Sequence, residues 1–265
     1  MEPFVALMRK YCIDYTNSHD QSVCDEIMHP DYVVHISQVD LPRDALYKPA
    51  VRQVFDRFPG LGLQVHEFLT NGDRLAMRFS EHGLAPAEAG RYAAWGGIGM
   101  YKWNGDQLLE NYVEQDFLAQ QAQLSGAVPQ APLEAPHLDP WVGTKAEPVN
   151  PEAESVVRDW LARRDLRDAP EVIIDASWYE GLAPSPIDVE KVVINDLFSA
   201  GDRVAFHVTQ TGGYVGGLLG VADSRRGGHA RLDCVGLARV EGGRVARVRA
   251  ITDRLGTARF LVQNA

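Results

Sequence analysis

Residues 71–83 read NGDRLAMRFSEHG, and residues 200–212 read AGDRVAFHVTQTG. A second pair of similar segments follows: residues 99–116, GMYKWNGDQLLENYVEQD, align with residues 236–253, GLARVEGGRVARVRAITD. The separation of the two segments grows from 28 residues in the first half to 36 in the second, which a longer hairpin loop around residues 223–228 would absorb. The sequence therefore predicts an internal duplication.

A proline-rich stretch separates the two copies. Six of the chain's 15 prolines lie between residues 125 and 151, and this stretch shows no sustained helical or strand period. Prolines at this density remove backbone donors and favour extended, unpaired chain. We therefore expect a first domain over residues 1–125, a linker over 126–150 and a second domain over 151–265.

The first copy has the pattern of a small α+β domain. Residues 3–17 carry apolar side chains at the three-and-four spacing of an amphipathic helix, and Asp20 can cap a second, shorter helix. The hydrophobic pattern and the Asn-Gly turns then predict a strand, a third helix and three hairpin-connected strands before the last strand, over residues 31–37, 50–58, 61–70, 73–82 and 92–103. This order predicts a curved antiparallel sheet with helices on its concave face and a pocket between them.

The second copy looks reduced. It keeps a long helix over residues 152–165 and the strand pattern, but residues 177–190 are too short and too proline-rich for the third helix. We therefore expect two tandem cone-shaped domains of the α+β class, packed through their sheets. The chemistry is expected in the first domain, and a structural or interface role in the second.

Composition excludes several classes of function. The formal charge of −10 and the pI near 5.3 argue against binding to nucleic acid, which needs clustered Lys and Arg. No stretch approaches the roughly 18 apolar residues of a membrane helix, and three cysteines without paired spacing are typical of reduced thiols, so we expect a cytoplasmic protein. The histidines lack the close spacing of a metal site, and no cofactor is implied.

The last strand of the first copy carries an unusual row of polar residues. Residues 110–120 read ENYVEQDFLAQ, so in an extended chain Glu110, Tyr112, Glu114 and Asp116 share one face. Asn111, Val113, Gln115 and Phe117 share the other. The polar face looks either toward water or into a polar cavity.

The ordered set of segments resembles the SnoaL-like polyketide cyclases of the nuclear transport factor 2-like superfamily. The segments that carry the resemblance are TNSHD, MHPDYVVH, FPGLGLQVHEFLTNGDRLAMRF and NGDQLLENYVEQDFLAQQAQL, over residues 16–20, 28–35, 58–79 and 104–124. It covers most of residues 1–124 and the strand pattern of 151–265. In these cyclases the last strand often has a Glu, a Trp and an acid-base Asp that faces the cavity. By this resemblance Asp116 is the acid-base residue and the polar face lines a cavity.

Two further residues are candidate partners of Asp116 in catalysis. His35 ends the first strand, where the cyclases often have a histidine, and it is either a satisfied histidine or an acid-base partner. Glu81 shares a strand face with apolar residues, so it is either a fraying strand end or a carboxyl within the pocket.

The candidate substrate-binding residues are mainly aromatic: Tyr11, Tyr15, Tyr112, Glu114 and Trp95. Tyr11 and Tyr15 lie on the first predicted helix. A tyrosine hydroxyl there can hydrogen-bond an enolate oxygen, as the resemblance to ketosteroid isomerases implies. The expected function is cofactor-independent proton transfer on a mid-sized apolar or aromatic oxygenated molecule, by an aldol-type cyclase, an isomerase, a dehydratase or a retro-aldol lyase. A non-catalytic carrier or assembly module and an epoxide hydrolase remain alternatives, and a homodimer is left open.

Overall fold

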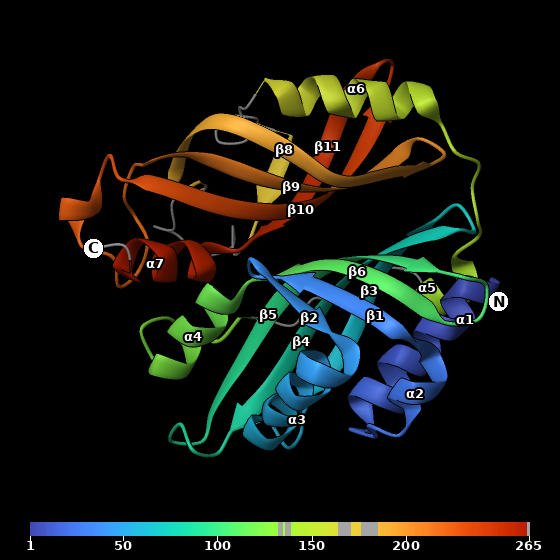
Figure 1. Ribbon diagram of the computed structural model, residues 1–265, viewed down its shortest axis with the longest axis horizontal. Coiled ribbons are helices and arrows are strands. Elements are labelled where there is room, and N and C mark those ends of the chain that lie inside the picture. The colour runs from blue at the N-terminus through green and yellow to red at the C-terminus, as the bar shows by residue number, and fades with distance from the viewer. Residues whose placement is uncertain (132–134, 136–138, 164–170, 176–184, 264–265) are drawn as a thin grey trace.

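The computed structural model describes residues 1–131, 135, 139–163, 171–175 and 185–263. Two β-sheets lie face to face, and helices cover the outer face of each sheet (Figure 1). The N-terminal half forms one sheet and the C-terminal half the other. This arrangement confirms the α+β class, the tandem organisation and the packing of the two halves through their sheets.

The first sheet has six strands in the order β2-β1-β6-β5-β4-β3. Their bounds are Met28–Ile36 for β1, Val39–Pro42 for β2, Gly62–Thr70 for β3, Arg74–Ala85 for β4, Arg91–Trp103 for β5 and Leu108–Gln115 for β6. The expectation of a wholly antiparallel sheet was wrong in one respect. Strand β1 pairs in parallel with β6, because the first strand of the copy returns beside the last one.

The second sheet repeats this topology with five strands in the order β7-β11-β10-β9-β8. Their bounds are Val172–Ile174 for β7, Ile187–Ala200 for β8, Arg203–Tyr214 for β9, His229–Glu241 for β10 and Arg244–Thr252 for β11. Strand β7 pairs in parallel with β11, as β1 does with β6. Asp73 lies in the β3–β4 turn and Asp202 in the equivalent β8–β9 turn, as the duplication requires. The prediction that the second copy is reduced depends on residues 177–190, and most of these lie outside the described residues.

Helices of the first half form a layer over its sheet. They are α1 (Pro3–Arg9), which continues as a π-helix (Lys10–Asn17), then α2 (Val23–Ile27), a second π-helix (Arg43–Tyr47) and α3 (Lys48–Arg57). The amphipathic spacing explains the first of these, since Phe4, Met8, Cys12 and Tyr15 are all buried on one side. The Glu2 side chain accepts the Val5 N–H at 2.8 Å and caps the helix.

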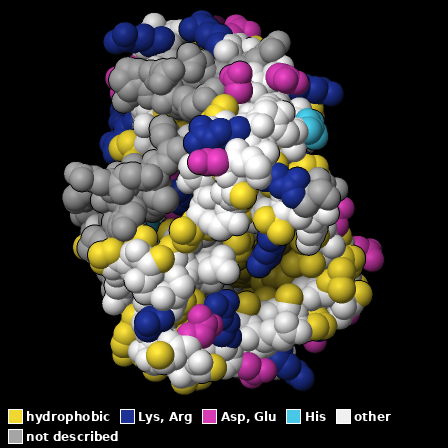
Figure 2. Space-filling view, turned by 90° about the vertical axis from the view of Figure 1, so that its left-hand side faces the viewer, with side chains coloured by type: hydrophobic (Ala, Val, Ile, Leu, Met, Phe, Trp, Pro, Cys, Tyr) yellow, Lys and Arg dark blue, Asp and Glu magenta, His cyan; other side chains and the backbone are white. Residues whose placement is uncertain are grey.

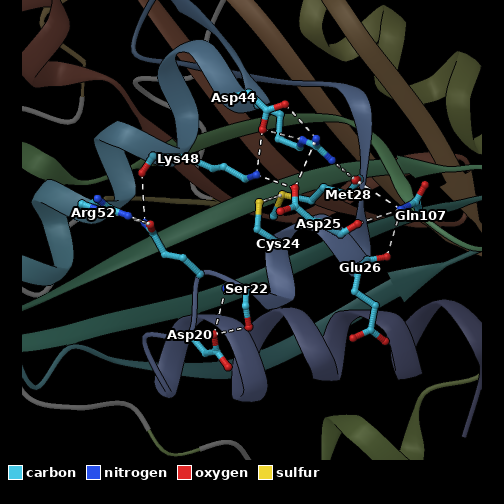
Figure 3. Close-up of polar contacts among 12 residues, drawn as sticks. Asp20, Ser22, Cys24, Asp25, Glu26, Met28, Asp44, Lys48, Arg52 and Gln107 are labelled. Carbon is cyan, nitrogen blue, oxygen red and sulfur yellow. Dashed lines mark hydrogen bonds and ion pairs between the residues drawn. The ribbon is translucent and has the colours of Figure 1, made fainter.

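Polar contacts join α2 to the start of α3 (Figure 3). The Lys48 ammonium lies between the carboxylates of Asp25 at 2.5 Å and Asp44 at 2.9 Å. The Gln107 side-chain amide donates to the backbone carbonyls of Asp25 at 3.2 Å and Glu26 at 3.1 Å. These contacts connect α2 with the start of α3 and with the β5–β6 turn. They fix the position of this part of the helical layer over the sheet.

A helix follows the last strand of each half, and neither helix was expected. Helix α4 (Phe117–Ser125) follows β6, and α7 (Arg254–Gln263) follows β11. The Asp116 side chain caps α4 by accepting the Ala119 N–H at 3.1 Å, and Asp253 accepts the Gly256 N–H at 2.9 Å at the start of α7. The two helices pack against each other at one end of the molecule (Figure 1).

The remaining helices complete the connection and the outer layer. Helix α6 (Pro151–Ala162) covers the second sheet, and its expected end at residue 165 lies outside the described residues. In the expected linker, α5 (Pro140–Gly143) rests on the first half, where the Trp141 ring lies 5.2 Å from that of Phe68. No helix in the part of the chain that the structure describes is long and apolar enough to cross a membrane.

Candidate functional site

A cavity of about 400 Å³ lies between the first sheet and the helices that cover it. Its floor comes from strands β1, β4, β5 and β6, and its walls come from the first π-helix, α3 and α4. Most of the lining is aliphatic or aromatic, including Val34, Val51, Phe55, Phe58, Leu63, Phe79, Val113 and Phe117. The expected pocket is therefore present in the first half.

Two glycines of β5 give the cavity its depth. A Cβ atom at Gly97 would lie 2.4 Å from the Phe79 ring, and one at Gly99 would lie 2.8 Å from the Tyr101 hydroxyl. Neither distance is compatible with a side chain at the glycine. The Phe79 side chain therefore packs over Gly97, and the Tyr101 side chain packs over Gly99. Both side chains lie flat against the sheet, which leaves space for the cavity above it.

Tyrosines supply most of the hydroxyl groups of the cavity. Tyr11 and Tyr15 come from the first π-helix, Tyr47 from the second and Tyr101 from β5. The Tyr11 and Tyr47 hydroxyls lie 3.2 Å apart, and burial raises the pKa of all four phenols above the ordinary value. These hydroxyls therefore stay protonated at neutral pH and can donate hydrogen bonds. The expected positions of Tyr11 and Tyr15 in the pocket are correct.

Two polar atoms of the cavity wall have no hydrogen-bond partner among the described residues. They are the Tyr15 hydroxyl and the Asn111 Oδ1 atom, and both residues are at most 2% exposed. Buried polar groups are normally paired, because leaving one unpaired costs about 1–3 kcal/mol. Both groups line the space that a ligand would fill, so a ligand oxygen or hydroxyl could complete their hydrogen bonds.

Glu81 is the single carboxylate among the residues described as lining this cavity. It lies on β4 opposite Trp95 of β5 and is 8% exposed. Burial raises its carboxyl pKa from 4.5 to about 7. Glu81 therefore sits within the pocket, and the alternative of a fraying strand end was wrong. Trp95 also lines the cavity, and its indole N–H donates to Gln115 Oε1 at 2.7 Å.

The polar row of β6 faces the other way. Asn111, Val113 and Gln115 line the cavity, whereas Tyr112 and Glu114 point toward the second sheet. The alternation was predicted correctly, but the expectation that the acidic face lines the cavity was wrong. The physical reason is that the second sheet covers the outer face of β6 and offers polar partners there.

Asp116 is held by an ion pair between the two halves. The Arg254 Nη2 atom lies 2.7 Å from each carboxylate oxygen of Asp116, and Arg254 Nε lies 3.3 Å from Asp175 Oδ2. Each of the three side chains is 3% exposed. Asp116 does not line the cavity described above, which contradicts its expected position there.

His35, Tyr112 and Glu110 form a cluster at the edge of the interface between the sheets. The His35 ring stacks on Tyr112 with centroids 4.3 Å apart, and its nitrogens lie 2.6 Å from Asp40 Oδ1 and 3.2 Å from Glu110 Oε1. None of these side chains is part of the cavity lining described above. The structure thus does not bring His35 or Tyr112 to the pocket with Glu81.

Glu114 is paired with a histidine of the second half. Its Oε1 atom lies 3.3 Å from His207 Nε2, and both side chains are at most 4% exposed. Burial raises the pKa of the Glu114 carboxyl and lowers the pKa of His207 to about 4. Both shifts favour the uncharged forms of the two side chains. Glu114 thus lies at the interface between the two sheets and is not among the residues that line the cavity.

Several lining residues escaped the sequence analysis. Asn111 and Gln115 were visible as the alternate face of β6, and that alternation was the signal that could have found them. Tyr47, Tyr101 and Arg259 carried no distinguishing pattern. Among the described residues, no group of three or more His, Cys, Asp or Glu side chains could hold a metal ion.

Comparisons with known proteins were made for the sequence and for the structure. A family model described as SnoaL-like polyketide cyclase matches residues 6–124 and 188–261. No curated protein sequence gives a significant match. Similar solved structures include AclR, a putative hydroxylase from Streptomyces galilaeus, with 19% identity and a TM-score of 0.44 over 50% of this chain and 87% of that one.

Two further similar structures also match about half of this chain. IdmH, a putative polyketide cyclase from Streptomyces antibioticus, has 20% identity and a TM-score of 0.43 over 47% of this chain and 99% of that one. TsrD from Streptomyces laurentii has 23% identity and a TM-score of 0.42 over 48% of this chain and 96% of that one.

Proposed function

Because the chain belongs to the SnoaL-like polyketide cyclase family, we propose that it moves protons on a mid-sized apolar or aromatic oxygenated molecule, without a cofactor. The observation that carries the proposal is the position of Glu81, a buried carboxyl in an aromatic cavity. Its pKa of about 7 makes it half ionised at neutral pH. A group with such a pKa can both take up and release a proton during turnover.

The cavity also offers groups that would stabilise charge on a substrate oxygen. Abstraction of a proton next to a carbonyl places negative charge on the carbonyl oxygen. The protonated, buried hydroxyl of Tyr15, which has no partner among the described residues, is suited to donate to that oxygen. Enolisation of this kind is shared by aldol cyclisation, double-bond isomerisation, dehydration and retro-aldol cleavage, so the final reaction depends on the substrate.

Asp116 and His35 are assigned other roles in this proposal. The Asp116 carboxylate accepts two hydrogen bonds from a buried arginine and also caps α4, so its oxygens are already engaged. It also lies outside the cavity lining, so it is a poor choice for proton transfer there. The epoxide hydrolase alternative needs an arginine and two acids facing a substrate. The residues that suggest it in the sequence, Arg249, Asp233 and Asp253, are absent from that lining.

The proposal is tested by hydrogen exchange, which reports the proton transfer whatever the final reaction is. The purified protein is incubated in D₂O with 2-tetralone, an aromatic ketone, and loss of the proton signals next to the carbonyl is followed by NMR. The wild-type protein should accelerate exchange over buffer. Glu81→Gln should lower that acceleration by about 10²- to 10⁴-fold, the usual contribution of a positioned base.

Glu114→Gln is the matched control, because it makes the same change at a buried carboxyl outside the cavity. It should keep the exchange activity, provided that its melting temperature shows an intact fold. Equal exchange by wild type and Glu81→Gln would overturn the assignment of Glu81. Tight ligand binding with no exchange above buffer would favour the alternative of a non-catalytic carrier, which the largely apolar lining also suits.

A further inference from the structure

The mouth of the cavity is marked by lining residues that are also exposed to solvent. They are Val54 and Arg57 near the end of α3, Gln121 of α4 and Arg259 of α7. Figure 2 shows this side of the molecule, with a hollow lined by hydrophobic side chains and basic side chains beside it. The second half of the chain thus contributes to the entrance of the first half's cavity.

The two arginines at the mouth differ in their partners. The Arg57 Nε atom lies 2.7 Å from Glu88 Oε1, so its charge is already compensated. Arg259 makes no hydrogen bond or ion pair with any residue that the structure describes. Burial raises the pKa of Asp253, and the positive charge of Arg259 is one of the smaller influences that oppose this rise. Arg259 therefore presents, at the entrance of an apolar cavity, a guanidinium that has no ion-pair partner among the described residues.

We infer that Arg259 binds the anionic end of the ligand and that the ligand is an aromatic or alicyclic acid, with a carboxylate at one end. This inference rests on the proposed function for the body of the ligand and adds its charged group. The apolar lining suits a ring system, whereas an ionised group is too costly to bury there without a partner. A guanidinium at the mouth lets the rings enter while the carboxylate stays partly solvated and paired.

The net negative charge of the protein makes a positive group at the cavity entrance more important for binding an anion. A formal charge of −10 repels an anionic ligand from most of the surface. A local positive group at the entrance offsets that repulsion where the ligand must pass. Helix α7, which carries Arg259, is fixed at its first residue by the ion pair between Arg254 and Asp116. The second half is thereby assigned a part in ligand selection.

The test compares two fluorescent probes with the same aromatic skeleton. 8-Anilinonaphthalene-1-sulfonate carries an anionic group, and N-phenyl-1-naphthylamine does not. Titration of the wild-type protein, with energy transfer from Trp95 as the sign of binding in the cavity, gives a dissociation constant for each. The variant Trp95→Phe shows how much of the energy-transfer signal comes from Trp95. Displacement of the uncharged probe by 2-naphthoate and by 2-naphthamide then compares a carboxylate with its neutral amide.

Arg259→Gln should weaken binding of the sulfonate probe and of 2-naphthoate by about two- to fivefold, the range for a solvent-exposed ion pair. Binding of the uncharged probe and of the amide should not change. Arg244→Gln removes one charge from an exposed position at the start of β11 and serves as the matched control. It should leave all four affinities unchanged.

Two results would overturn the inference. One is an equal effect of Arg259→Gln on the charged and uncharged members of each pair, including no effect on either. The other is an equal loss of affinity for the anionic ligands in Arg244→Gln, which would show that only the overall charge of the protein affects their binding. Glu81→Gln separates this inference from the proposed function, because it should abolish proton exchange and keep the dependence of acid binding on Arg259.

Discussion

Replacing Glu81 by glutamine should stabilise the protein at alkaline pH. The folded protein raises the pKa of this carboxyl from 4.5 to about 7, chiefly because burial disfavours its charged form. A shift of about 2.5 units corresponds to about 3 kcal/mol of lost stability once the group is fully ionised in both states. Glutamine cannot ionise, so the variant does not have this loss.

The direction of the pH dependence follows from proton binding. Between pH 4.5 and 7 the folded state holds a proton on Glu81 that the unfolded state has released. The stability of the wild-type protein therefore falls as pH rises through this window, and the loss is complete above the folded pKa. From pH 5 to pH 8.5 the advantage of Glu81→Gln over wild type should grow by about 2.5 kcal/mol.

Urea denaturation of both proteins at pH 5 and pH 8.5 measures this change. The other buried titratable groups, such as Asp175 and His207, are common to both proteins, so their contributions cancel in the difference. Any constant cost of burying the glutamine amide cancels between the two pH values as well. A change of less than about 0.5 kcal/mol would mean that Glu81 titrates near its ordinary pKa. The main support for its catalytic role would then be lost.

Three further predictions concern the residues around the cavity and the interface. Arg254→Met should lower the free energy of unfolding by about 3–5 kcal/mol in urea denaturation, because it leaves the buried carboxylates of Asp116 and Asp175 without a cation; a loss below about 1 kcal/mol would contradict this. Asp116→Asn should lower the melting temperature while ketone exchange stays within about threefold of wild type; a hundredfold loss of exchange with unchanged melting would restore Asp116 as the proton carrier. Gly97→Ala should cost about 1–3 kcal/mol and weaken binding of the uncharged probe, because the new methyl group displaces the Phe79 ring; unchanged stability and binding would show that the close approach has no role in shaping the cavity.

The sequence predicted the repeat and most of its strands because both depend on local patterns. The turn before Arg74 and the turn before Arg203 share the same residues, and each lies between two strands of regular hydrophobic pattern. The helices after Asp116 and Asp253 were missed. Each begins at an acid that ends a strand, and nothing in the alternating pattern of that strand shows that the chain turns helical after it.

The candidate site was predicted only in part, because alternation defines two faces of a strand without saying what covers each face. In β6 the row with Val113 proved to face the cavity, and the row with Glu114 proved to face another sheet. The stacking of the two sheets depends on contacts between residues far apart in the chain, such as Asp116 and Arg254, 138 positions apart. A cavity wall that includes α7 was beyond prediction for the same reason.

The tandem arrangement explains why the acids of β6 and the acid of the cavity have different roles. A sheet covered by helices on one side must present its other side to water or to another element. Here the second sheet covers that side, so the charged groups that would have been solvated must be compensated within the protein. Arg254 pairs with Asp116, and Glu114 pairs with His207, where burial shifts both pKa values toward the uncharged forms. Glu81 has no arginine, lysine or histidine bonded to it in the part of the chain that the structure describes, which is why the proposed function assigns the proton transfer to it.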